Sequence, residues 1–235
     1  MNKNEKMIKD FNLYARSEHG ISSNKLNGYK TYMSGMISPT IIEERQMNVA
    51  AMDVFSRLMM DRVIFLGTAI DSDVANIIAS QMMYLNSVDS DNDIKLFLNT
   101  PGGECISGMQ IYDIMQWVDC DVATYNMGLS ASMGSILLSS GKRGKRYALP
   151  HSKIMIHQPM GGVPGGTQES DFFIAYEQIR ECKNTLYTVL SENTGKTIEE
   201  ITFDADRDHW LKPEECLPNI YGQFGLIDNI IKKEK

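Results

Sequence analysis

The chain has 235 residues, with 23 Lys and Arg against 30 Asp and Glu, and therefore a formal net charge of −7. This acidic balance argues against a protein whose main task is to bind nucleic-acid phosphates. With 43% hydrophobic residues the chain can bury a large core, which argues against global disorder. No apolar stretch approaches the roughly 18 residues that cross a bilayer, so we expect a cytoplasmic protein without a membrane partner.

Cysteine usage indicates a reducing compartment. The 4 cysteines are widely spaced and form no C-x-x-C pair, which argues against a structural zinc site. A chain with a core of this size also has no need of a disulfide framework. We therefore expect reduced thiols and no bound metal.

Residues 1–38 differ in composition from the rest of the chain. They are rich in Asn, Lys, Ser, Gly and Tyr and poor in branched apolar residues. This composition indicates an N-terminal extension, which is a propeptide, a flexible segment or a segment that docks on a partner. The acidic residues Glu5, Asp10 and Glu18 disfavour a transit peptide. The globular domain is expected at 39–235.

From residue 39 the sequence alternates between helical and strand patterns. Residues 47–60 have amphipathic, helical spacing, and the apolar run at 62–67 ends in glycine and predicts a buried strand. Asp73 offers an N-cap for a helix through Leu85, and residues 94–98 predict the next strand.

The same alternation continues in the second half of the chain. A helix is expected through Met109 to Trp117, a strand at 121–127, a helix at 130–139, a strand at 154–156 and a long helix at 171–191. Strands that alternate with helices of roughly 10–15 residues form β-α-β units with a mostly parallel sheet and right-handed crossovers. The predicted fold class is α/β.

A serine lies at one of the predicted strand-to-helix junctions, in Met127-Gly-Leu-Ser-Ala-Ser-Met-Gly134. Backbone N–H groups at a helix start could stabilise an oxyanion beside a nucleophile. An ordinary N-cap among small residues has the same pattern, and spacing does not separate Ser130 from Ser132. The missing G-x-S-x-G elbow argues against an α/β-hydrolase.

Among the 4 histidines, His157 has the position best suited to a general base. It ends the apolar strand at 154–156, and reactive groups of open α/β sheets collect where strands end. On position alone, a hydrogen-bonded structural histidine at a strand end is the favoured interpretation. Three carboxylates in Asp204-Ala-Asp-Arg-Asp208 could orient such a base, although a surface salt-bridge cluster is the usual meaning of this pattern.

Two glycines end the turn Asn99-Thr-Pro-Gly-Gly103 after the strand at 94–98. They let the backbone present bare N–H groups, as in a phosphate cradle or an oxyanion hole. Neither nucleotide-binding glycine pattern is present, so an oxyanion hole or a plain tight turn is the better interpretation.

Together these segments closely resemble the ClpP family, the proteolytic subunits of Clp proteases. The matching motifs occur in the family's order across residues 39–235: Asn99-Thr-Pro-Gly-Gly103, Ala131-Ser-Met-Gly134, Met155-Ile-His-Gln-Pro159, Asp206-Arg-Asp208 and Gly225-Leu-Ile-Asp228. The serine motif and the histidine motif at this separation are highly specific. The resemblance implies a ClpP/crotonase-like fold with repeated β-β-α units, a mostly parallel sheet and a protruding strand-helix handle at about residues 158–193.

The resemblance also implies roles for individual residues of a serine endopeptidase. Ser132 matches the family's nucleophile, His157 its general base and Asp208 the third member of the triad. Gly103 and Met133 match the residues whose N–H groups form the oxyanion hole. Gly161 and Gly162 begin the segment that would pair with the backbone of a substrate.

Assembly and partners are further implications of the resemblance. Family members form two stacked heptameric rings through the handle, and AAA+ Clp unfoldases of the ClpX, ClpA or ClpC kind feed them unfolded proteins. The unfoldase uses ATP, so no cofactor is expected in this chain. Arg207 matches a residue that couples ring stacking to the triad, and six residues match apolar docking pockets at the ring rim: Phe97, Trp117, Tyr125, Met127, Tyr147 and Leu149.

One segment departs from the family pattern, and two other functions are compatible with the fold. Residues 213–222 form a small insertion between Asp208 and the last motif, which bears on the placement of the triad acid. A crotonase-type acyl-CoA enzyme would share the fold but would not need the triad. A non-catalytic subunit of a mixed Clp ring would usually have lost triad residues, and this chain retains them.

Overall fold

The computed structural model describes residues 40–45, 48–218 and 223–232. The N-terminal extension expected at 1–38 lies outside the described residues, as does the end of the predicted insertion, residues 219–222.

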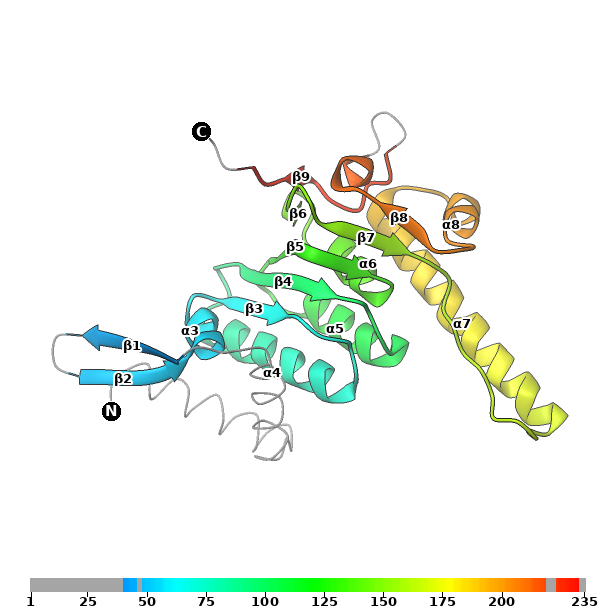
Figure 1. Cartoon of the computed structure of the whole chain (residues 1–235), viewed down its shortest axis with the longest axis horizontal. Coiled ribbons are helices and arrows are strands. Elements are labelled where there is room, and N and C mark those ends of the chain that lie inside the picture. Colours follow the sequence, from blue (N-terminus) through cyan, green and yellow to red (C-terminus); the bar gives the residue numbers. More distant parts are fainter. Residues whose placement is uncertain (1–39, 46–47, 219–222, 233–235) are drawn as a thin grey trace.

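A seven-stranded sheet organises the described part of the chain (Figure 1). Its main path runs β3–β4–β5–β6–β9 with every pair parallel, and these strands are β3 (Val63–Leu66), β4 (Ile94–Thr100), β5 (Val122–Ala131), β6 (Arg146–Ala148) and β9 (Asn229–Ile230). β7 (Lys153–Ile156) pairs parallel with the end of β5, and β8 (His209–Leu211) pairs antiparallel with β7. The prediction of an α/β fold with a mostly parallel sheet is confirmed.

The helices cover the sheet because alternate residues of each strand point into the core. Along β4, Ile94, Leu96 and Leu98 are completely buried, whereas Lys95 and Asn99 are exposed. α4 (Ser72–Val88) and α5 (Cys105–Trp117) lie side by side along one face, as Figure 1 shows, and α6 (Met133–Ser139) packs against β5. One buried apolar cluster connects these helices with the strands.

The helix expected at 47–60 is wrong in its first half. β2 (Asn48–Asp53) pairs antiparallel with β1 (Thr40–Arg45), and only α3 (Val54–Met60) is helical. Asp53 sets this boundary, because its side chain accepts hydrogen bonds from the Ser56 N–H at 2.9 Å and the Ser56 hydroxyl at 2.6 Å.

Two other helix starts differ from the predictions. Asp71 caps α4 by accepting from the Val74 N–H at 2.9 Å, and Asp73 lies in the first turn instead. β5 continues through Ser130 and Ala131, so α6 begins at Met133 and not at Ser130. The sequence does not predict the short strands β6, β8 and β9, because two or three residues show no periodicity.

The long helix predicted at 171–191 is α7 (Glu169–Thr194), followed by α8 (Ile198–Asp204) and the short 3-10 helix η1 (Pro213–Cys216). The first turns of α7 project away from the sheet, and the segment that connects it to β7 runs beside it (Figure 1). Gly161 permits this close approach, since a Cβ at this position would lie 2.5 Å from Cδ1 of Ile179 on α7. α7 and this segment lie where the resemblance implies a handle, at about residues 158–193, although the segment before α7 forms no strand.

Candidate active site

Ser132 lies on a strained turn between β5 and α6. Its φ of 54° and ψ of −124° place a non-glycine residue at positive φ, which costs about 1–3 kcal/mol and is common at functional sites. The turn is clamped on both sides: the Ser132 N–H donates to the Met155 carbonyl at 2.9 Å, and the Ser132 carbonyl accepts from the Ser135 N–H at 2.9 Å. The surrounding structure therefore holds the side chain at the strand end.

The structure distinguishes the two serines that spacing left open. Ser130 lies within β5, is completely buried, and its hydroxyl has no hydrogen-bond partner among the described residues. Ser132 is only half-buried, and its Oγ lies 2.9 Å from Nε2 of His157. Ser132 is thus the serine that the fold brings to a base.

His157 directly follows β7 and connects the serine with a carboxylate. Its Nδ1 lies 3.2 Å from Oδ1 of Asp208, while its Nε2 faces Ser132. The side chain is only 10% exposed. In the tautomer with the proton on Nδ1, the ring donates to Asp208 and accepts the proton of the serine hydroxyl, which is the arrangement a general base requires.

Asp208 is the carboxylate of its cluster that reaches His157. It lies between α8 and β8, and its side chain is 62% exposed. Asp204 pairs instead with Nζ of Lys196 at 2.9 Å, and Asp206 lies 3.8 Å from Nε of Arg207. The predicted triad residues Ser132, His157 and Asp208 are therefore brought together in one hydrogen-bonded series.

The predicted oxyanion-hole residues lie next to this series. Within the described part of the chain, the N–H groups of Gly103 and Met133 donate no hydrogen bond to another protein group. A Cβ on Gly103, whose φ is 155°, would lie 2.1 Å from the Ile70 carbonyl oxygen. Only glycine fits between this turn and the neighbouring chain.

Gly102 is a site residue that the sequence reasoning missed. Its φ is 88°, and a Cβ there would lie 2.7 Å from Cβ of Ser132 and 2.9 Å from the Met133 nitrogen. The glycine therefore lets the turn approach the nucleophile and the Met133 nitrogen closely. The pair of consecutive glycines was the available signal, but it did not show which glycine faces the serine.

Thr100 is a second missed residue, and it holds the glycine turn. Its buried hydroxyl donates to the Thr68 carbonyl at 2.6 Å and accepts from the Gly102 N–H at 3.1 Å. Its methyl group packs so close to Gly134 of α6 that a Cβ there would lie 2.7 Å away. A threonine at the end of a strand carries no distinctive sequence signal.

Two grooves share Met160, which lies on the segment after His157, and one of them includes triad residues. One is lined by His157, Asp208, Gly161 and Ile179, and the other by Cys105, Met109, Cys182 and their neighbours on α5 and α7. Met160 lines both grooves and is 82% exposed. Gly162 is exposed and lines neither groove.

Three of the four cysteines have a pKa above the ordinary value of a thiol. Burial raises the pKa of Cys120, raises that of Cys182 to about 12, and raises that of Cys216 further. These thiols stay protonated near neutral pH, and all four cysteines are free. In the described ranges no group of three or more His, Cys, Asp or Glu side chains could hold a metal ion.

Three of the six predicted docking residues form an aromatic stack across the sheet. The ring centroids of Phe97 and Tyr125 are 4.5 Å apart, and those of Tyr125 and Tyr147 are 4.9 Å apart. Met127 on β5 and Leu149, directly after the end of β6, are exposed. Trp117 ends α5, is 64% exposed, and makes no ring contact with the stack in the part of the chain that the structure describes.

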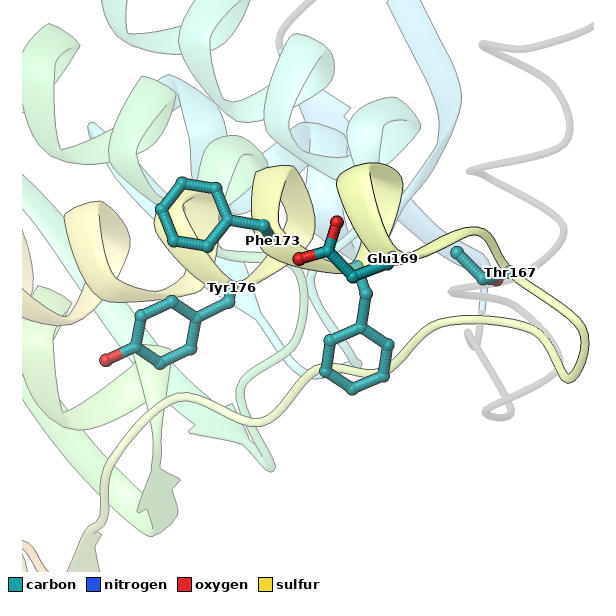
Figure 2. A pocket seen from close by; sticks show the side chains of 5 residues that line it. Thr167, Glu169, Phe173 and Tyr176 are labelled. Atoms are coloured by element: carbon teal, nitrogen blue, oxygen red, sulfur yellow. The ribbon is translucent and has the colours of Figure 1, made fainter.

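The outer end of the handle is rich in exposed apolar residues. Phe172, Phe173, Ile174 and Tyr176 are each more than half exposed on the first turns of α7. Figure 2 shows the Phe173, Tyr176 and Glu169 side chains projecting from the helix, near the loop that carries Thr167. Arg207, the predicted ring-stacking residue, is 87% exposed beside Asp208.

No helix among the described residues is long and apolar enough to cross a membrane.

The comparisons with known proteins all indicate the same family. The model of the family described as Clp protease matches residues 45–234. The ATP-dependent Clp protease proteolytic subunit of Porphyromonas gingivalis is 50% identical over 228 residues, 97% of this chain and 100% of that protein. The subunit of the same name from Bacteroides fragilis YCH46 is 45% identical over 96% of this chain and 99% of its own length. Proteolytic subunit 2 of Rhodococcus jostii is 46% identical over 77% of this chain and 89% of its own length.

Proposed function

Since the chain belongs to the Clp protease family, we propose that it is the proteolytic subunit of an ATP-dependent Clp protease, a serine endopeptidase that hydrolyses unfolded polypeptides to short peptides. The observation that carries this proposal is the series Ser132–His157–Asp208, with contacts of 2.9 Å and 3.2 Å, beside two unused backbone N–H groups. A chain that retains this arrangement is suited to acyl transfer.

The proposed mechanism follows from the positions of these groups. Nε2 of His157 takes the hydroxyl proton as Oγ of Ser132 attacks the peptide carbonyl, and Asp208 orients the imidazole and stabilises its charged form. The N–H groups of Gly103 and Met133 bind the oxyanion of the tetrahedral intermediate, an effect worth roughly 3–4 kcal/mol per donor. The imidazolium then protonates the leaving amine. Water, deprotonated by His157, hydrolyses the acyl-enzyme and releases Ser132.

Every step of this mechanism uses side chains and backbone groups of the chain itself. We therefore infer that it needs no metal and no organic cofactor, and that ATP is consumed by the partner. The extended segment at Gly161 and Gly162 has no strand partner among the described residues, which supports its pairing with a substrate backbone by β-addition.

The same proposal includes assembly into two stacked heptameric rings. The exposed apolar residues on the outer turns of α7 are the kind of surface that a second copy would cover. Arg207, next to Asp208 and almost fully exposed, is placed to connect such a contact with the triad. A closed chamber would admit unfolded chains only, which fits a subunit fed by a partner.

The proposed partner is an AAA+ Clp unfoldase of the cytoplasm. The aromatic stack of Phe97, Tyr125 and Tyr147, with Met127 and Leu149 exposed beside it, supports an apolar docking pocket for the partner's loops. Trp117 would belong to this pocket only if assembly brings it there. The triad argues against both a crotonase-type enzyme and a non-catalytic subunit, since neither needs it.

A fluorophosphonate probe tests the proposal directly. The assembled protein, alone and with an unfoldase, is incubated with the probe, and the labelled peptide is mapped by mass spectrometry. Labelling at Ser132 is expected, with none in Ser132→Ala and unchanged labelling in Ser130→Ala. Absence of labelling in the wild type under both conditions would contradict the serine-peptidase proposal.

A further inference from the structure

The Asp208 carboxylate contacts the general base, but few neighbouring groups hold the Asp208 side chain in place. Its side chain is 62% exposed, and it follows a turn that begins where α8 ends. On its far side the register of β7 and β8 pairs Ile156 with His209. The near side of the loop must be held by other contacts if the carboxylate is to stay 3.2 Å from His157.

Gln158, the residue after the general base, makes those contacts. Its backbone N–H donates to the Ala205 carbonyl at 2.8 Å, and its side-chain Nε2 donates to the Asp206 carbonyl at 2.8 Å. Two consecutive carbonyls of the loop are thus bound by one residue. Because Gln158 is bonded to His157, these hydrogen bonds tie the base and the acid loop to each other directly.

Lys183 on α7 sets the orientation of the Gln158 amide. Its Nζ lies 3.3 Å from Oε1 of Gln158, and an ammonium group can only donate. A backbone carbonyl can only accept, so Asp206 requires the amide nitrogen on its side. Both neighbours therefore select the same amide orientation, and a carboxylate in place of the amide could satisfy Lys183 but not Asp206.

The handle helix supports this lysine from one turn away. Nζ of Lys183 lies 5.2 Å from the centre of the Tyr187 ring, four residues along the same face of α7. The Tyr187 hydroxyl lies 3.5 Å from the Ala205 carbonyl, at the same loop. Tyr187 of α7 thus meets the loop that carries Asp208 directly, and Lys183 reaches this loop through Gln158.

We propose that Gln158, oriented by Lys183, is a positioning residue that holds the Asp208 loop against His157 and connects the handle helix with the triad. This inference rests on the proposed serine-peptidase function. In the proposed peptidase mechanism, Gln158 touches no reacting atom. Its effect passes through the Asp206 backbone to Asp208, and from Asp208 to the imidazole.

Replacement of Gln158 by methionine tests the proposal with little change in side-chain volume. Hydrolysis of a short fluorogenic peptide by the assembled full-length protein gives kcat and KM as functions of pH. We expect Gln158→Met to lower kcat about tenfold with KM within about twofold, since a misplaced catalytic group affects turnover more than binding. The acid limb of kcat/KM should move to lower pH, because a less well-held Asp208 stabilises the imidazolium less.

Further variants separate positioning from general stability. Gln158→Glu should be as impaired as Gln158→Met although it can pair with Lys183. Lys183→Met should lower kcat about threefold, and Lys183→Arg should restore most of this loss. Gln116→Met is the matched control, because Gln116 also donates from its amide to a carbonyl, that of Ser140 at 3.1 Å, away from the triad. Its kcat and pH profile should equal those of the wild type.

The outcomes distinguish this inference from the proposed function. Wild-type kcat and an unshifted acid limb in both Gln158→Met and Lys183→Met would overturn the positioning role while leaving the peptidase intact. An equal loss in Gln116→Met would also overturn it. If Ser132→Ala were as active as the wild type, the proposed function would fail and the inference with it. Should Gln158→Met not assemble, the contrast between Lys183→Met and Lys183→Arg decides.

Discussion

Ser132 lies on a turn clamped by the protein core, whereas Asp208 lies on a loop that is mostly open to solvent. The nucleophile's turn is bound through Met155 and Ser135 and is packed against the glycine turn that Thr100 holds. The acid loop is bound through Gln158 and through the pairing of β8 with β7. The proposed nucleophile and the proposed oxyanion hole thus lie on turns held by the sheet, while we propose that the position of Asp208 depends on contacts from the handle side.

The largest effect is expected from changing the acid itself. Asp208→Asn should lower kcat/KM by about 10³, because the amide favours the wrong imidazole tautomer and cannot stabilise the charged ring. Peptide hydrolysis by the assembled protein measures this. Asp206→Asn is the control and should stay within about twofold, since its carboxylate does not reach His157 and the substitution keeps the Asp206 backbone carbonyl that accepts from Gln158. Similar losses in both variants would mean that the loop and not the Asp208 carboxylate is required.

Adding a single methyl group at Gly102 should displace the turn that carries Ser132. Gly102→Ala would bring a Cβ to 2.7 Å from Cβ of Ser132 and 2.6 Å from the Ala131 carbonyl oxygen, at a φ of 88°. The turn must move, so we expect a loss of roughly 100-fold in kcat and in the rate of fluorophosphonate labelling. Gly165→Ala, where a Cβ would meet nothing within 4 Å, should behave like the wild type. Unchanged labelling of Gly102→Ala would show that the turn does not control the nucleophile.

The buried ion pair of Arg146 and Asp228 should contribute strongly to the free energy of unfolding. Arg146 is 5% exposed, lies 2.7 Å from Asp228, and also donates to the carbonyls of Ser139 on α6 and Asn193 on α7. Removing one partner leaves a buried charge, so Asp228→Asn should lower the free energy of unfolding at pH 7 by about 3 kcal/mol in urea denaturation. Asp61→Asn removes an exposed ion pair with Arg57. This substitution should lower the free energy of unfolding by less than about 0.5 kcal/mol.

The same pair predicts a pH dependence of stability. Burial alone would raise the pKa of Asp228, but the hydrogen bonds and charge of Arg146 outweigh it and hold the pKa below the ordinary value of 3.8. The stabilisation of the folded state by this ion pair is therefore complete above pH 3.8. It is lost as the pH falls through the lower pKa that Asp228 has in the folded state. Urea midpoints measured from pH 6 to pH 2 should show this loss in the wild type and a weaker one in Asp228→Asn.

The smallest effect is expected at the other serine. The Ser130 hydroxyl is buried without a partner, so Ser130→Ala removes a polar group that gains nothing from the fold. Activity should stay within about twofold, and the free energy of unfolding should be unchanged or higher by up to about 1 kcal/mol. A large loss of activity would show that Ser130 takes part in the site.

Local patterns predicted the elements that are long and strongly periodic. β4 and α7 were predicted because alternation and helical spacing extend over enough residues to be distinctive. The helix at 47–60 was half wrong because Asp53 caps a helix there while the preceding residues pair as strands. Gly102 and Thr100 were missed because their importance lies in how closely another segment approaches them.

By itself the sequence determined an α/β fold, a serine and a histidine at strand ends, and, through the order of its motifs, the Clp protease family. It could not determine from spacing which serine reaches the base, which acid orients it or which glycine faces the nucleophile. Ser132 and His157 are 25 residues apart, and His157 and Asp208 are 51 apart. Only the parallel pairing of β5 with β7 and the antiparallel pairing of β7 with β8 bring these residues within hydrogen-bond distance. Such contacts depend on sheet register, and register is a property of the whole packed sheet and not of any one segment.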